Sequence, residues 1–295
     1  MSNVHTIADS DNSLISLTCR YTLEIRNSTE WAPPPPPHHP NNGKMNLRLI
    51  PALLILTLSY APAFAQQDLS ELNDIAGEFA FVRIQYDSYF DGGYYGGPWA
   101  TDFPAADENF LRGVSRLTNV RVVSRPIVLR FDDEEIFDYP FLYALEMGRN
   151  GGLSLSTNEL ENLREYLMRG GFLLIDDFWG ERQWDAFYRD FSMIFPDREL
   201  VELQPDHEIY HTFYDIEGAQ MIPGRGGRQG FGQQGMDIAS NHAIVDDDGR
   251  VMVLVNWNSD MGDGWEHTYD QWYPTQYANS AYQLGINYLI YSLTH

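Results

Sequence analysis

The stretch from Ser156 to Gly180 constrains the fold of this chain more than any other part. Ser156 and Glu159 match a capping box, in which each side chain satisfies a free amide at the start of a helix. Leucines then recur at helical spacing, and the pair Gly170-Gly171 ends the helix. The unbroken apolar run 172–175 is typical of a strand buried on both faces of a parallel sheet. The stretch therefore predicts a helix followed by a central strand.

Two adjacent carboxylates, Asp176 and Asp177, follow that run and reach the carboxyl end of the predicted strand. Ligands bind at this edge of open α/β sheets, so both are candidate catalytic residues, and Trp179 is a candidate ligand-binding residue beside them. Neighbouring side chains in a strand face opposite ways, so only one can point at a ligand unless the chain bends. Two carboxylates forced together can work as acid and base. Alternatively, one caps the helix near Glu181 and the other is solvated.

The order of the remaining elements predicts an α/β layered fold with a largely parallel sheet. A strand broken by Pro126 is expected at an edge of that sheet. The turn at residues 246–249 predicts a hairpin. The expected strands are 79–86, 121–131, 141–147 and the two arms of the hairpin within 243–255, with an extended segment at 200–216; the expected helices are 106–117, 181–194 and 280–293.

Residues 45–65 have the pattern of a signal peptide, with an apolar run that ends in a small-x-small site, and cleavage is expected after Ala65. A membrane anchor is the alternative, although the run is shorter than the roughly 20 residues of a spanning helix. Residues 1–44 lie upstream and contain a run of five prolines, so they are interpreted as disordered or as a misplaced start. Residues 66–295 would then form a single exported domain, periplasmic or extracellular.

Charge and cysteine content exclude several classes of function. The formal net charge is −23, and residues 1–65 contribute nothing to it, because four basic residues balance four acidic ones. An acidic domain of this kind repels nucleic acid and anionic lipid, so neither is expected as a partner. The only cysteine is Cys19, within the segment to be removed. The mature domain therefore has no disulfide and no thiol nucleophile.

The segment His207-Glu208-Ile209-Tyr210-His211 matches the H-E-x-x-H pattern of zinc proteases. That chemistry needs a helix, with Glu208 placed to activate a metal-bound water. The flanking β-branched and aromatic residues favour extended chain instead. His207 and His211 then share a face and could hold a metal, or they serve in structural hydrogen bonds. No cofactor is required by the sequence, and a divalent metal remains the alternative.

The polar, glycine-containing segment 256–267 follows a predicted strand. Trp265 is a candidate surface for stacking on a sugar or another planar apolar face, and Glu266 is a candidate ligand-binding residue next to it. Asp260, Asp263 and His267 are expected to contribute to the same site as Asp176 and His207. The alternative is a surface loop with a partly buried tryptophan.

Four pieces of the sequence together resemble the bacterial domain-of-unknown-function 4159 family. They are the Asp102-Phe103-Pro104 segment up to Phe110, the strand end GGFLLIDDFWG, the segment HEIYHTFYDI and the closing LGINYLIY helix. The resemblance implies a three-layer, flavodoxin-like sandwich similar to class I glutamine amidotransferases, and it implies no established activity. Those enzymes place a nucleophilic cysteine at a turn after a central strand, where this chain has Asp176 and Asp177.

The sequence thus favours a non-catalytic domain that binds a small-molecule or carbohydrate ligand or a partner protein. The alternative is a hydrolase, either metal-dependent through the HEIYH segment or acid-base through Asp176 and Asp177. Both hypotheses require the paired acids and the histidine segment to meet along one rim of the sheet.

Overall fold

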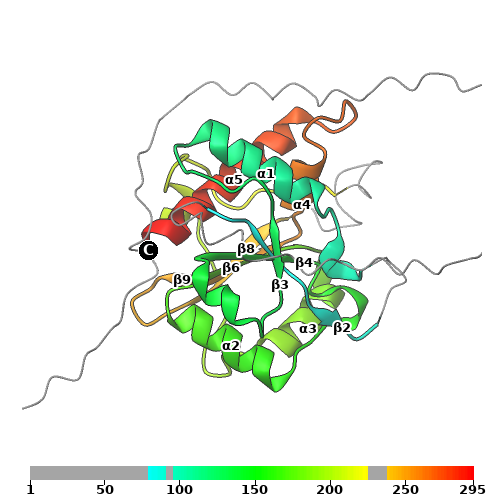
Figure 1. Cartoon of the computed structure of the whole chain (residues 1–295), viewed down its shortest axis with the longest axis vertical. Helices are drawn as coiled ribbons and strands as arrows, with labels where there is room; N and C mark the ends of the chain where they lie inside the picture. The colour runs from blue at the N-terminus through cyan, green and yellow to red at the C-terminus, as the bar shows by residue number, and fades with distance from the viewer. Residues whose placement is uncertain (1–78, 91–95, 225–237) are drawn as a thin grey trace, which may run out of the picture.

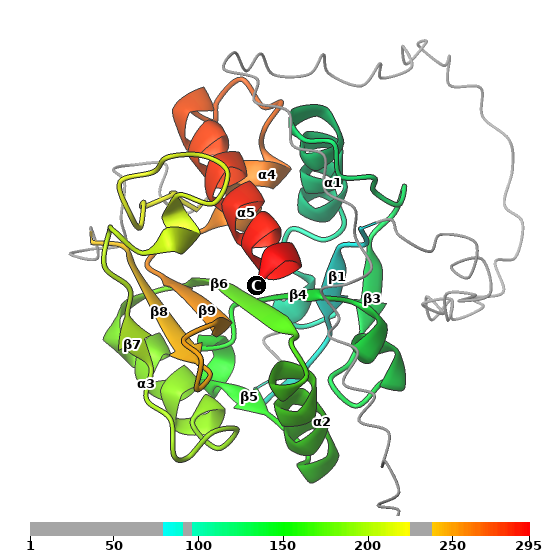
Figure 2. The ribbon, with the colours of Figure 1, turned by 90° about the vertical axis from the view of Figure 1, so that its left-hand side faces the viewer.

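The chain forms three layers, a central sheet with helices on both of its faces (Figures 1 and 2). The computed structural model describes residues 79–90, 96–224 and 238–295. One face is covered by α1 (Ala105–Leu117), α4 (Met261–Glu266) and α5 (Thr275–Thr294), and the other by α2 (Thr157–Met168) and α3 (Gly180–Phe191). Two hydrophobic clusters fill the spaces on either side of the sheet. The predicted three-layer α/β fold is confirmed.

The seven strands of the sheet run in the order β3-β1-β4-β6-β9-β8-β7. The first five pair in parallel, and their order along the chain is 2-1-3-4-5, which is the flavodoxin-like order. β8 and β7 extend the sheet with antiparallel pairing. The bounds are β1 Val82–Ile84, β3 Ile127–Leu129, β4 Phe141–Leu145, β6 Phe172–Phe178, β7 Val201–Glu202, β8 Ser240–Val245 and β9 Val251–Trp257; β2 (Asp87–Ser88) and β5 (Leu153–Ser154) form a separate pair.

The helix and strand that the sequence predicted most directly are α2 and β6. The Ser156 hydroxyl accepts a hydrogen bond from the Glu159 amide (3.2 Å), and the Glu159 carboxylate accepts one from the Ser156 amide (2.9 Å). Gly170, with φ 106°, takes the left-handed conformation that ends the helix. β6 is buried along its whole length and lies fourth of the seven strands, which confirms its central place.

β6 does not end as a regular strand. Its register with β9 shifts between Ile175 and Phe178, and Asp177 has a left-handed backbone (φ 52°). A regular strand would turn the side chains of Asp176 and Asp177 to opposite faces of the sheet. The bend at Asp177 removes that constraint, and both carboxylates remain at the carboxyl edge.

Other predicted boundaries need correction. The segment 200–216 was expected to be extended, but only Val201–Glu202 pairs as a strand, and Glu208–Tyr210 forms one turn of 3-10 helix. Of the expected strand 79–86, the ladder includes only Val82–Ile84, with an isolated bridge at Phe79. The hairpin at 246–249 and the edge position of β3 are confirmed. The remaining 3-10 turns are Pro98–Ala100, Glu134–Asp138 and Arg149–Gly151.

Among the described residues, no helix combines the length and the apolar character that a membrane crossing requires. The predicted signal segment, residues 45–65, lies outside the described residues.

Candidate functional site

Acidic side chains from four chain segments meet at the carboxyl edge of the parallel sheet. Asp102 lies just before α1 in the long connection that leaves β1, Glu146 follows β4, Asp177 is part of the end of β6, and Asp260 follows β9. The order of the strands reverses between β1 and β4, and ligands of open α/β folds bind at such a reversal. The acids therefore lie where this fold type places its ligand.

Five acids and one histidine at this edge form two groups of three, and together we call them the acidic cluster. The first group is Asp102, Asp177 and Asp260, and the second is Asp263, Glu266 and His267. Within each group, one potential metal-ligating atom of every residue lies within 4.8 Å of the others. Only Asp102 and Glu266 retain appreciable exposure; the other four side chains are buried.

Helix α4 fixes the second group by its periodicity. Asp263, Glu266 and His267 are spaced i, i+3 and i+4, which places their side chains on one face of a helix. Asp260 caps this helix, because its Oδ1 accepts a hydrogen bond from the Asp263 amide (2.7 Å). The short helix therefore holds members of both groups in fixed relative positions.

Two glycines allow the carboxylates to approach one another. A Cβ atom added to Gly224 would lie 2.6 Å from Asp260 Oδ2 and 3.5 Å from Asp263 Oδ2. A Cβ atom added to Gly262 would lie 2.5 Å from Asp102 Oδ2 and 3.4 Å from Asp260 Oδ1. The oxygens of both groups thus face the same small region, and larger residues at these positions would displace them.

Burial and mutual repulsion raise the pKa values of the first group. For Asp102, Asp177 and Asp260, burial is the largest cause, and neighbouring carboxylates raise each pKa further. Glu146, adjacent to the cluster, also has a pKa raised by burial, although an ion pair with Arg149 and a hydrogen bond from Thr101 (3.1 Å) oppose the shift. Without a cation, protons must therefore compensate part of the negative charge.

Two buried atoms of the cluster make no hydrogen bond. They are Asp102 Oδ2 and His267 Nε2. Because an unsatisfied buried polar atom costs about 1–3 kcal/mol, such atoms are rare unless a ligand satisfies them. Among the salt bridges of the described residues, none joins an arginine to Asp102, Asp177 or Asp260. These three carboxylates therefore have no direct arginine partner, although the charge of Arg83 acts to lower the pKa of Asp102.

The backbone around the cluster is strained. Five described residues other than glycine have a left-handed backbone, and four of them, Asp102, Glu146, Asp177 and Asn258, lie in or beside the cluster. Such conformations cost of the order of 1–3 kcal/mol each and are concentrated at functional sites. Asn258 also connects β9 to α3, because its Oδ1 accepts a hydrogen bond from the Gly180 amide (2.9 Å).

Asp176 has a different environment from Asp177. Its carboxylate accepts hydrogen bonds from the Tyr143 hydroxyl (2.9 Å), the Asn256 amide (3.1 Å) and the backbone amides of Met261 (2.8 Å) and Gly262 (3.1 Å). Burial raises the pKa of Asp176 to about 6, although these four donors favour the charged form. Asp176 therefore anchors the start of α4, and Asp177 belongs to the candidate ligand group.

Of the predicted ligand-binding residues, Trp179 and Glu266 lie at this site. Trp179 donates a hydrogen bond from Nε1 to Asp177 Oδ1 (2.7 Å) and is 8% exposed. Neither aspartate caps α3, because the cap position is held by Trp179. Trp265 requires a correction: its ring is fully buried against Phe110 and other aromatic residues, so it has no free face for a sugar.

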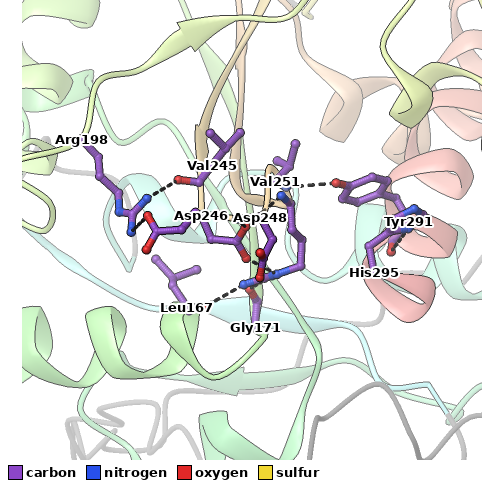
Figure 3. A network of polar contacts seen from close by, with 11 residues as sticks. Leu167, Gly171, Arg198, Val245, Asp246, Asp248, Val251, Tyr291 and His295 are labelled. Atoms are coloured by element: carbon purple, nitrogen blue, oxygen red, sulfur yellow. Dashed lines mark hydrogen bonds and ion pairs between the residues drawn. The ribbon is translucent and has the colours of Figure 1, made fainter.

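The predicted convergence of the histidine segment with the aspartates is wrong. The His207 ring lies 6.4 Å from that of Tyr291, whose hydroxyl accepts a hydrogen bond from the amide of Val251, the first residue of β9 (Figure 3). Asp176 contacts Asn256, five residues further along β9, which is roughly 17 Å away at 3.3 Å per residue. His207 and the aspartates therefore lie at opposite ends of the sheet.

The histidines are also engaged in local contacts. The His207 ring accepts a hydrogen bond from the Ile209 amide (3.2 Å), and the His211 ring contacts Asp215 and the Pro205 carbonyl. Among the described residues, neither histidine belongs to a group of three potential metal ligands. The Glu208 side chain is 60% exposed and lies 3.7 Å from His295. This arrangement does not match the zinc-protease geometry.

Sequence reasoning missed the roles of Asp102, Glu146 and Asp270. Glu146 directly follows β4, so the carboxyl end of that strand was the signal that could have found it. Asp102 lies just before α1, well after the end of β1, and its strand gives no such signal. Asp270 contacts the His267 ring (2.8 Å), and its position three residues after His267 is the local signal that could have found it.

The comparisons with known proteins show a family. A model of the family described as domain of unknown function (DUF4159) matches residues 80–293. Among curated proteins, none matches the chain.

Proposed function

The chain belongs to the family described as domain of unknown function (DUF4159), and we propose that it is an exported binding domain whose acidic cluster holds a divalent cation. The observation that supports this most strongly is the buried, unsatisfied Asp102 Oδ2 beside the carboxylates of Asp177 and Asp260. A divalent cation would satisfy this atom and neutralise the charges that burial opposes.

Three aspartates would hold the cation: Asp102, Asp177 and Asp260. Carboxylate oxygens are the ligands preferred by Mg²⁺, Mn²⁺ and Ca²⁺. Because the pKa values of these groups are raised, cation binding would displace protons and become tighter as pH rises. A bound cation would supply a positive centre for an anionic or hydroxylated small molecule. A carbohydrate remains a candidate through such contacts, without stacking on Trp265.

Calorimetric titration with Mn²⁺ tests the proposal. We expect saturable binding with release of protons, detected as a dependence of the heat on the ionisation enthalpy of the buffer. Asp260→Asn should weaken binding by at least about 100-fold, since loss of an outer-shell partner alone costs about 10–100-fold. This variant keeps an oxygen that can cap α4.

Asp247→Asn is the matched control, because it removes the same charge from an 88%-exposed side chain at the other end of the sheet. It should bind Mn²⁺ as the wild type does. Equal binding by the wild type and by Asp260→Asn, or no binding by either, would overturn the proposal.

The proposed export is tested separately. Mass spectrometry of the protein secreted from its natural host should find a mature chain that begins near Gln66. A chain that retains residues 45–65 would favour the membrane anchor instead.

A second candidate function is hydrolysis at the same site. It is supported by the left-handed backbone of Asp177 at the turn between β6 and α3, because related folds carry a nucleophile at a strained strand-to-helix turn. The similarity to class I glutamine amidotransferases enters here as a proposal, with a carboxylate in place of the cysteine. Turnover of a phosphate, ester, peptide or glycoside panel that Asp177→Asn or a chelator abolishes would support catalysis. Saturable binding without turnover would support the binding domain.

A further inference from the structure

We propose that the acidic cluster holds a second cation, bound by Asp263, Glu266 and His267, so that the site is a dinuclear metal centre with Asp263 between the two ions. This inference rests on the proposed function, because it assumes that the first group binds a cation.

Helix α4 presents the three ligands of the second ion in one place. His267 Nε2 lies 3.4 Å from Asp263 Oδ1 and 3.1 Å from Glu266 Oε2, and it makes no hydrogen bond. The histidine is 6% exposed, so water does not readily satisfy that nitrogen. When protonated, the imidazole can form ion pairs with these two carboxylates, and a cation placed among the three atoms would take the place of that proton and separate the carboxylates.

The second observation is that Nδ1 of His267, the ring nitrogen opposite Nε2, has a carboxylate partner and that aromatic rings pack against the imidazole. Its Nδ1 contacts Asp270 Oδ2 (2.8 Å), and the rings of Trp272 and Tyr273 pack at centroid distances of 4.5 and 5.8 Å. When Nδ1 donates its proton to Asp270, Nε2 is left with a lone pair directed at Asp263 and Glu266. Metal-binding histidines characteristically have this carboxylate partner, which fixes both the tautomer and the ring orientation.

Asp263 is positioned to contact both ions. Its Oδ1 faces His267, and its Oδ2 lies near the point where a Gly224 Cβ would also meet Asp260 Oδ2. One oxygen is thus turned toward each group of ligands. In dinuclear sites, in which the ions lie about 3.5–4 Å apart, a carboxylate between them limits their repulsion.

The donor atoms indicate which ion to use as a probe. The first group offers carboxylate oxygens, and the second adds one imidazole nitrogen to two carboxylates. Mn²⁺ accepts both kinds of donor. It is also paramagnetic, so two neighbouring Mn²⁺ ions give an exchange-coupled electron paramagnetic resonance spectrum that isolated ions do not.

Equilibrium dialysis of the mature chain against Mn²⁺ tests the inference. We expect two ions per chain and a coupled spectrum. His267→Gln should bind one ion and lose the coupling, and Glu266→Gln, at a 28%-exposed side chain, should weaken the second ion if His267→Gln does not fold. Asp270→Asn should weaken the second ion by about 10–100-fold and leave the first unchanged.

His211→Ala is the matched control, since it removes a 39%-exposed histidine from the other end of the sheet and should retain both ions. Suppose that the wild type binds one ion per chain, that His267→Gln retains this ion and that Asp260→Asn loses it. This result would overturn the dinuclear inference and leave the proposed function intact. No bound ion in the wild type would overturn both.

Discussion

The two ends of the central sheet both carry several acidic residues, but they compensate the charge differently. At the amino end of β9, the carboxylate of Asp246 accepts hydrogen bonds from the Arg250 guanidinium (2.9 Å) and from the amides of Asp248 (3.0 Å) and Arg250 (2.9 Å) (Figure 3). Asp247 pairs with Arg198 (2.9 Å). At the carboxyl end, Asp102, Asp177 and Asp260 have no such arginine among the described salt bridges.

This difference separates structural acids from candidate ligands. The Arg250 guanidinium also donates to the carbonyls of Leu167 and Gly171, so the amino-end network joins the β8–β9 hairpin to the end of α2 (Figure 3). The acids of this network, Asp246 and Asp247, have arginine partners within the folded chain. The acids at the carboxyl end lie close together, because Gly224 and Gly262 leave room for their side chains and Asp260 caps α4. Their burial disfavours the charged form of each carboxyl group. A bound cation would account for this arrangement.

The largest effect is expected where an arginine and an acid are buried together. Arg83 and Asp107 are both fully buried and form a two-point ion pair (3.0 and 2.6 Å). Arg83→Met should lower the free energy of unfolding by about 3–5 kcal/mol, because it leaves the buried Asp107 side chain without its partner. Urea denaturation measures the loss.

The loss should be the same with and without Mn²⁺, because this pair is structural. The double variant Arg83→Met/Asp107→Leu should recover most of it. If Mn²⁺ reversed the loss of stability, an arginine partner would not distinguish structural acids from candidate metal ligands.

The next effect concerns pH. The pKa of Asp176 is raised by burial from 3.8 to about 6, so its contribution to stability is complete below pH 4 and is lost as pH rises through 6. The difference between the two pKa values corresponds to about 3 kcal/mol of folding free energy, at about 1.36 kcal/mol per pKa unit. Urea denaturation of the metal-free wild type, compared with Asp176→Asn between pH 4 and 7.5, should show the wild type losing about this much relative to the variant. A parallel pH profile for the two proteins would contradict the raised pKa.

A smaller effect is expected at the amino end. Arg250→Met should cost about 2 kcal/mol, because charge-assisted hydrogen bonds are worth roughly 1.5–3 kcal/mol and this side chain is only 13% exposed. The midpoint of thermal unfolding would report the loss. Binding of Mn²⁺ should be unchanged, and a variant that no longer bound the ion would show that the two ends are coupled.

The sequence predicted elements whose signals are local. The capping box at Ser156 and Glu159, the buried strand that follows, and the hairpin at 246–249 each depend on neighbouring residues, and all three are confirmed. Asp177, Glu266 and Trp179 were found at the site because they lie at or just after predicted strands and helices.

The remainder of the site depends on contacts between distant segments. The H-E-x-x-H pattern carries no information on whether its histidines meet the aspartates, and here α5 places them at the opposite end of the sheet. Trp265 lies in a polar, glycine-containing segment that is typical of a loop, yet residues of α1 and α5 bury its ring. Whether an acid has an arginine partner is likewise a property of the folded chain, so Asp246 and Asp260 could not be distinguished from sequence.

Anomalous X-ray diffraction from crystals soaked in Mn²⁺ tests the central claim most directly, because it locates the ion without reference to any variant. We expect anomalous density among Asp102, Asp177 and Asp260 at the carboxyl end of the sheet. Density at Asp246–Asp248 or at His207 and His211, or no density at the acidic cluster under saturating Mn²⁺, would contradict it.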